Sequence, residues 1–130
     1  MCHMTNNRVF LNNEDIIEIQ AIGPQNSESV EAMGRDVDSL LTEQKKVGKP
    51  GLVLDNLLEL GAVDAEARKL VVELGKRLDY DRLAMLGKGG IMRLGTNLML
   101  RATGQSYRLR YFDNREQATK WLQETSWRKR

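Results

Sequence analysis

The sequence predicts one α/β domain with a five-stranded, mostly parallel sheet, an antiparallel N-terminal hairpin and four helices. Two observations indicate this fold class: short apolar segments alternate with amphipathic helical ones, and only a turn separates the first two strands. Alternating strands and helices imply right-handed crossovers and parallel pairing. The expected order is ββαβαβαβα over residues 8–125, between a disordered tail at residues 1–7 and a basic tail at residues 126–130.

The opening hairpin is predicted from two short patterns. Residues 9–11 are apolar, and residues 12–15 form an Asn- and Asp-rich turn. Over residues 16–22 every odd position is apolar, a pattern typical of a half-buried strand. Gly23-Pro24 is expected to end that strand.

An amphipathic helix is expected from residue 26 or 27 to Lys46. Asn26 or Ser27 can cap it, because their side-chain oxygens accept hydrogen bonds from free backbone N–H groups. Residues 48–51 end it with glycine and proline. Its apolar face consists of Val30, Met33, Val37, Leu40 and Leu41.

The middle of the chain predicts a strand, a loop and a second helix. Residues 52–54 are continuously apolar, which is typical of a strand covered on both faces. Residues 56–63 are interpreted as a loop with Gly61 as a pivot. Asp64 stands where a helix cap belongs. The helix is expected to end near residue 78, since apolar residues recur at helical spacing at Leu70, Val71, Leu74 and Leu78.

The last third of the chain continues the alternation. Residues 83–86 and 107–112 predict strands, and residues 87–90 predict a glycine-rich turn. The helix between them is expected to bury one stripe, formed by Ile91, Leu94, Leu98, Met99 and Ala102. The spacing from Asp113 to Glu116 is that of a capping box, which would begin a last helix with the apolar face Ala118, Trp121 and Leu122.

Composition restricts the class of protein. Hydrophobic residues make up 41% of the chain and charged residues 29%, which excludes the disordered and membrane-spanning classes. No charged-then-apolar leader is recognised, and a single cysteine excludes an intramolecular disulfide framework, so we expect a cytoplasmic protein.

The net charge of +2 is the sum of two unequal segments. Residues 1–81 hold nine Lys and Arg against fifteen Asp and Glu, a net of −6, whereas residues 82–130 hold eleven against three, a net of +8. A polarised chain can present a basic face to an anionic partner. The simpler interpretation is that the two segments of one domain attract each other.

The glycine-rich turn is a candidate anion site. It follows a strand and begins a helix, an arrangement that exposes backbone N–H groups to a phosphate or carboxylate. Lys88, Gly89, Gly90 and Arg93 would bind that ligand. The alternative is a tight turn that needs glycine for a positive φ. The glycine spacing matches neither a P-loop nor a dinucleotide-binding fingerprint.

Asp55, Asp64 and Glu66 surround the loop after a predicted central strand. Three carboxylates can bind a metal or act in acid–base chemistry. The alternative is that Asp64 caps the following helix, while the helix dipole favours Glu66 in its first turn. We therefore expect no catalytic residue, metal site or cofactor here.

Other candidates for chemistry are few. His3 and Cys2 are adjacent and can take up copper or nickel, but a site on a terminus is usually incidental. With one histidine and one cysteine, His-based triads, thiol catalysis and tetrahedral Cys/His zinc are not expected.

Arg108 and Arg110 alternate with Tyr107 and Tyr111, and basic residues interleaved with aromatic ones can bind nucleic acid. Here the tyrosines fall on the opposite face of the strand and are expected in the core. Nucleic-acid binding is therefore not expected.

Leu57, Leu58 and Leu60 lie in the predicted loop, where apolar residues are less expected. They would form an exposed patch that docks a partner or a second copy, or they would cover one end of the core. The sequence leaves both interpretations open.

The order of elements resembles the STAS fold of bacterial anti-sigma factor antagonists of the SpoIIAA type. Over residues 8–123 the chain more closely resembles small bacterial SpoIIAA-like proteins. The likeness is carried by residues 61–70 (Gly-Ala-Val-Asp-Ala-Glu-Ala-Arg-Lys-Leu) and by a tail comprising residues 94–104, 108–113, 116–118 and 121–122.

This resemblance implies a non-enzymatic regulatory or protein-interaction module. In the antagonists a kinase phosphorylates a serine at the start of the helix after the central strand. The matching residues 63–66 keep an acidic residue but lack both serines. The partner, or a second copy of the chain, would contact Leu57, Leu58, Asp64, Ala65, Glu66 and Arg68.

The SpoIIAA-like group is also related in shape to lipid-transfer domains of the CRAL-TRIO type. The alternative function is therefore binding of a small anionic or lipid-like ligand in a pocket near residues 87–93.

Overall fold

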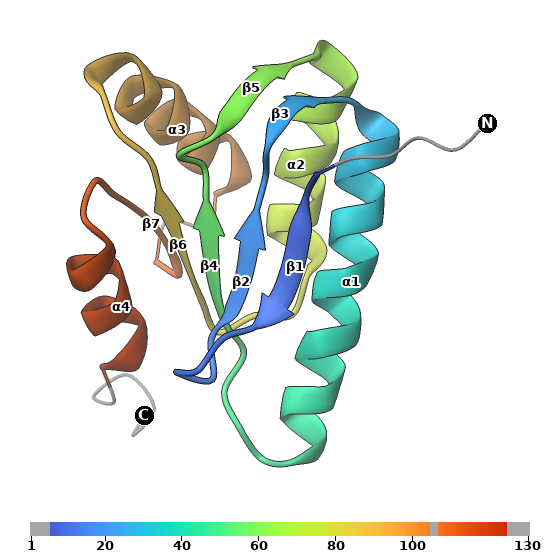
Figure 1. The fold of residues 1–130 in the computed structure, drawn as a ribbon, viewed down its shortest axis with the longest axis vertical. Helices are drawn as coiled ribbons and strands as arrows, with labels where there is room; N and C mark the ends of the chain where they lie inside the picture. Colours follow the sequence, from blue (N-terminus) through green and yellow to red (C-terminus); the bar gives the residue numbers. More distant parts are fainter. Residues whose placement is uncertain (1–5, 105–106, 125–130) are drawn as a thin grey trace.

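The computed structural model describes residues 6–104 and 107–124, which fold around a five-stranded sheet (Figure 1). Its strands are β1 (Arg8–Leu11), β2 (Ile17–Gln20), β4 (Leu52–Asn56), β6 (Arg82–Leu86) and β7 (Leu109–Phe112). They lie in the order β1-β2-β4-β6-β7. The first two strands pair antiparallel and all other neighbours pair parallel, so the predicted sheet with its opening hairpin is confirmed.

The described residues include the four expected helices: α1 (Ser27–Lys46), α2 (Ala65–Arg77), α3 (Gly90–Thr103) and α4 (Arg115–Gln123). Figure 1 shows α1 and α2 together on one side of the sheet and α4 on the other. The third helix packs against α2 and β7. No helix in the described ranges is both long and apolar enough to cross a membrane.

Alternate strand positions build two cores. On the α1 side, Val53 of β4 packs in a cluster with Leu41 of α1. On the α4 side, Leu54 of β4 packs in a second cluster with Trp121 of α4. The continuous apolar run of β4 is therefore covered on both faces, as the sequence predicts.

The helix caps agree with the sequence at two positions and differ at a third. Asn26 and Ser29 form a reciprocal capping box at the start of α1, and Asp64 accepts a hydrogen bond from the Ala67 N–H. The box expected at Asp113 is wrong. Asn114, one residue later, caps α4, and the Asp113 carboxylate instead accepts a hydrogen bond from Arg93 at 2.6 Å.

A second, two-stranded sheet was not expected. Its parallel strands are β3 (Gly23–Gln25) and β5 (Leu60–Val63), which lie where the sequence predicts a strand end and a loop. Their backbones approach closely because Gly61 has no side chain: a Cβ there would lie 2.8 Å from the Gly23 carbonyl carbon. Such short strands, with glycine and proline in them, carry no alternating apolar pattern.

The expectation that β2 is half-buried is also wrong. Ile16 and Ile17 are fully buried on opposite faces, and Glu18 on the expected open face is only 3% exposed. Arg115 of α4 covers this carboxylate and forms two hydrogen bonds with it. A charged side chain on β2 is thus buried through its ion pair.

Several residues of the apolar stripe predicted for α3 are exposed and do not belong to the core. Leu94 is 64% exposed and Leu98 57% exposed. Ala102 is exposed too, while the side chains of Ile91 and Met99 lie outside the described part of the structure. Helical spacing alone does not identify which side of a helix meets a neighbour.

Tyr107, expected in the core, is 75% exposed and precedes β7. The other tyrosine of that alternation, Tyr111, is half-buried against the α1-side core. The expectation is therefore confirmed for Tyr111 and wrong for Tyr107.

Attraction between the acidic and basic segments is realised at Glu18 and Arg115. The other ion pairs seen between described residues join residues of the same segment, including Lys49 with Asp15 and Arg93 with Asp113. Attraction between the two segments is therefore seen at one described ion pair. The candidate metal ligands His3 and Cys2 and the basic tail at 126–130 lie outside the described residues.

Candidate functional site

A cavity of about 140 Å³ lies between the sheet and the helices on its α1 side. All strands of the structure except β1 contribute to it, with helices α1 and α2 and the C-terminal residue of α3. Its lining is almost entirely apolar. Typical contributors are Ile19, Val37, Leu57, Leu74, Met85 and Leu109.

Asp55, on the central strand β4, is the acidic residue among the described residues that line the cavity. Strand register places it beside Ile19 on one side and Met85 on the other, on the face that Val53 shares. The residue is half-buried and borders the cavity. Among the described residues nothing donates a hydrogen bond to this carboxyl.

Burial raises the pKa of Asp55 from 3.8 to about 7. The physical cause is the loss of water around the carboxylate without a compensating cation. A carboxyl of this kind exchanges its proton near neutral pH, which marks it as a candidate functional group.

The other polar groups of the cavity have partners. The Gln25 side chain hydrogen-bonds with Asn7 and Ser29. The Tyr80 hydroxyl donates to the Gly75 carbonyl oxygen at 2.5 Å. Burial, opposed by the nearby Arg108 charge, raises the pKa of Tyr80 to about 12. Asp55 therefore differs from these polar neighbours in having no hydrogen-bond partner among the described residues, although it lines the cavity.

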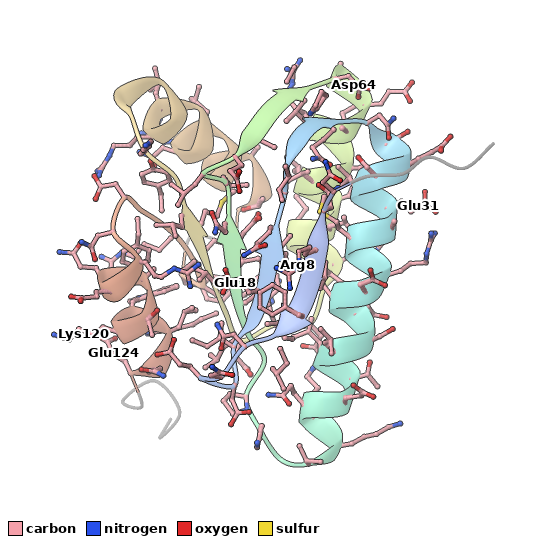
Figure 2. The ribbon with its side chains drawn as sticks, viewed as in Figure 1. Arg8, Glu18, Glu31, Asp64, Lys120 and Glu124 are labelled. Carbon is pink, nitrogen blue, oxygen red and sulfur yellow. The ribbon has the colours of Figure 1, made fainter. Side chains whose placement is uncertain are left out.

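The three carboxylates that were considered as a candidate site do not share one environment. Asp55 borders the cavity, whereas Asp64 and Glu66 are exposed at the start of α2. Figure 2 shows Asp64 at this position, where it caps the helix. No group of three potential metal ligands occurs in the described residues. The helix-cap interpretation of Asp64 is confirmed. The position of Asp55 at a cavity, apart from the other two carboxylates, was not predicted. The signal for it was an aspartate that falls between the apolar residues Val53 and Leu57 on one face of a strand.

The predicted partner surface is partly exposed. Leu58 is 45% exposed, and Asp64, Ala65, Glu66 and Arg68 all lie at the surface. We call these five residues the β5–α2 surface, because they flank the two ends of β5.

Leu57, expected in the same patch, is only 7% exposed and lines the cavity. Its backbone N–H donates to the Leu86 carbonyl at 2.7 Å, which holds its side chain against the core. The alternation of a strand continues beyond β4 and turns Leu57 inward, so of the three leucines of this turn Leu58 is the exposed one and Leu60 is half-buried.

The backbone of the β5–α2 surface is well held. Leu58 N–H donates to the Asn56 side chain at 3.0 Å, and the Arg68 guanidinium donates to the Val63 carbonyl at 3.1 Å. Asp64 N–H donates to the Gln25 carbonyl. This surface is therefore presented on a rigid frame.

The glycine-rich turn shows the geometry of a tight turn. Gly89 has φ +95°, which favours glycine, and Lys88 and Gly90 are exposed. Arg93 pairs with Asp113 and lies over the Tyr111 ring at 5.2 Å. None of these turn residues is among the described residues that line the cavity. The predicted ligand pocket near residues 87–93 is therefore separate from that cavity and stays a prediction.

Arg108 and Arg110 contact groups within the chain. Arg108 donates to the carbonyls of Leu78 and Tyr80 at the end of α2 and lies 3.9 Å from the Tyr80 ring centre. Arg110 lies over the rings of Phe112 and Trp121. Both arginines contribute to the packing of β7.

Comparison with known families gives a match over residues 16–123 to the family described as SpoIIAA-like. The chain belongs to the SpoIIAA-like family. The earlier resemblance is thereby confirmed over most of the chain. A comparison with curated protein sequences finds no match.

Two solved structures share this SpoIIAA-like fold. One is an uncharacterised protein of the DUF3478 family from Shewanella loihica PV-4, with a TM-score of 0.60 and 18% identity, covering 94% of this chain and 98% of that one. The other is the anti-sigma factor antagonist SpoIIAA in its unphosphorylated form, with a TM-score of 0.57 and 14% identity, covering 85% and 91%. At these identities the likeness establishes the fold alone.

Proposed function

We propose that this SpoIIAA-like chain is a non-enzymatic regulatory or protein-interaction module that docks a protein partner through the β5–α2 surface. The observation that carries the proposal is Leu58, an exposed leucine on a hydrogen-bonded turn at one end of β5, with the charged first turn of α2 at the other end of that strand. Exposed apolar side chains rimmed by polar ones are typical of protein contacts.

Family membership supports the same direction. A structural relative is an anti-sigma factor antagonist, a protein whose activity is exerted on another protein. In the antagonists the start of the helix after the central strand is a regulatory position. The corresponding helix here is α2, and its first residues are exposed.

Regulation at that position would not use phosphorylation. Ala65 is the first residue of α2 and has no hydroxyl group, and its neighbours Asp64 and Glu66 carry fixed negative charges. An anionic helix start is electrostatically favourable without modification. We therefore propose a constitutive docking surface.

The alternative function, a small anionic or lipid-like ligand near Lys88–Arg93, has less support. Arg93 is paired with Asp113, and the cavity is lined by other residues.

The test is a comparison of Leu58→Asp with Val47→Asp. Val47 is an equally suitable exposed apolar residue, at the end of α1 remote from β5 (Figure 1). We expect the wild-type chain and Val47→Asp to recover the same binding protein from lysate of the native source, and Leu58→Asp to recover at least tenfold less. Light scattering of the purified chain identifies a second copy as the partner if Leu58→Asp alone converts a dimer to a monomer. Equal recovery by both variants, with no change of mass, would contradict the proposal.

A further inference from the structure

We propose that the cavity on the α1 side of the sheet binds a small, largely apolar molecule that carries one amino group, with the Asp55 carboxylate as the partner of that amine. The juxtaposition that carries the proposal is a carboxyl without a partner, on the central strand, at the wall of an otherwise apolar cavity.

The size of the cavity limits the ligand. An engineered apolar cavity of about 150 Å³ in another protein binds benzene. The present cavity of about 140 Å³ is therefore suited to a single six-membered ring or a short branched chain. Aliphatic side chains of the cavity wall would contact that apolar body, among them Ile19 of β2, Val37 of α1 and Leu74 of α2.

The charge of the ligand follows from what faces Asp55. Of the described residues that line the cavity, the titratable ones are Asp55 and Tyr80, and the Tyr80 hydroxyl is already bonded to Gly75. The lining residues that the structure describes include neither lysine nor arginine. A ligand ammonium supplies the missing counter-charge and donates up to three hydrogen bonds, whereas a ligand carboxylate would be repelled.

An ionised carboxylate that is largely withdrawn from water and has no partner is unfavourable for folding, and a ligand that pairs with it regains part of that cost. The raised pKa of Asp55 describes the same imbalance. Because the amine needs the ionised carboxylate, its affinity is expected to fall as the pH drops below 7.

This proposal is independent of partner docking. The β5–α2 surface lies outside the cavity, and Leu58 is not among its lining residues. Failure of one proposal therefore leaves the other intact.

The experiment is a titration of the isotope-labelled full chain at pH 8 with benzylamine, benzyl alcohol, toluene and benzoate, followed by backbone amide chemical shifts. We expect benzylamine to shift the resonances of lining residues such as Ile19, Leu57 and Met85, and to bind at least tenfold more tightly than benzyl alcohol. Asp55→Asn should weaken benzylamine at least tenfold and leave toluene unchanged. The matched control Asp36→Asn, at an exposed carboxyl on α1, should change neither.

A second measurement keeps the test decisive if Asp55→Asn alters the fold. In the wild-type chain, benzylamine affinity should fall at least fivefold between pH 8 and pH 5.5. Shifts confined to surface residues, binding of toluene alone, or equal benzylamine affinity in the wild type and Asp55→Asn would each overturn the proposal.

Discussion

Arg115, the first residue of α4, holds both carboxylate oxygens of Glu18 on β2, at 3.1 and 2.6 Å. The Glu18 side chain is almost fully buried, whereas that of Arg115 is about half exposed. Burial on its own raises the pKa of Glu18, but hydrogen bonds from Arg115 and Asn12 outweigh it and hold the pKa below its usual value. This pair joins the N-terminal hairpin to the C-terminal helix.

Arg115→Met is expected to lower the free energy of unfolding by about 2–3 kcal/mol at pH 7, because it leaves the buried carboxylate without its main partner. A carboxyl whose folded pKa is depressed contributes stability above its unfolded pKa and loses it as the pH falls. The difference between the variant and the wild type should therefore shrink below about pH 4. Urea unfolding at pH 7 and pH 3.5 measures both values.

The matched control for this ion pair is Arg35→Met. Arg35 pairs with Glu31 at 3.1 Å on the open face of α1, and both side chains are largely exposed. A solvated pair of this kind contributes about 0.5 kcal/mol or less, so its loss should be near the limit of measurement. An equal cost for both substitutions, or a cost for Arg115→Met that is the same at both pH values, would contradict the role of Glu18.

The contribution of Asp55 to the free energy of unfolding is expected to depend on pH in the direction opposite to that of Glu18. Its folded pKa is raised to about 7 from 3.8, so the folded state holds this proton more tightly than the unfolded state. Its unfavourable contribution is absent below about pH 4, grows as the pH rises, and levels off above about pH 7 at roughly 4 kcal/mol. Asp55→Asn should therefore stabilise the chain at pH 8 and have little effect at pH 4.

The measurement is thermal and urea unfolding of Asp55→Asn, Asp36→Asn and the wild type from pH 4 to pH 8. Asp36 is an exposed carboxyl on α1, and its substitution should leave the slope of stability against pH unchanged. If Asp55→Asn retains the slope of the wild type, the carboxyl of Asp55 is not the group that titrates.

The main sheet could be predicted because each of its strands is a short apolar or alternating segment that is bounded by turn or helix signals. Residues 52–54 and 83–86 are examples, and both became central strands. The small β3–β5 sheet was missed for a physical reason. Its pairing depends on the close approach of Gly61 to Gly23, and no local apolar pattern reports such a tertiary contact.

The candidate sites divide in the same way. Asp64 was predicted as a cap because capping is a local interaction with a residue three positions later. The exposure of Leu94 and the burial of Glu18 depend on which elements come to lie beside them. The cavity at Asp55 is likewise formed by several packed elements. The sequence therefore indicated Asp55 as a candidate residue but did not predict the cavity that it borders.

Tyr111→Phe is expected to stabilise the chain by about 1 kcal/mol. The hydroxyl of Tyr111 is buried and has no hydrogen-bond partner among the described residues, so its removal relieves an uncompensated polar group. The ring, with Arg93 stacked over it, is retained. Tyr80→Phe is the matched control: its hydroxyl donates to Gly75, so the same change should cost about 1 kcal/mol. Chemical denaturation of both variants tests the difference, and a loss of stability in Tyr111→Phe would show that its hydroxyl has a partner.

Gly61→Ala is expected to destabilise the chain by about 1–3 kcal/mol, because the new methyl group would lie 2.8 Å from the Gly23 carbonyl carbon and 2.9 Å from the Pro24 nitrogen. Both atoms belong to the backbone of β3, so the two short strands must move apart. Gly95→Ala is the control within α3, where a Cβ meets nothing within 4 Å. There the substitution should stabilise the helix by about 0.5–1 kcal/mol.

Urea unfolding measures the stability of both variants, and amide hydrogen exchange at Asp64, whose N–H donates to the Gln25 carbonyl, reports on the β3–β5 junction. Faster exchange at Asp64 in Gly61→Ala alone is the expected result, and unchanged exchange would show that the β3–β5 pairing does not depend on the missing side chain.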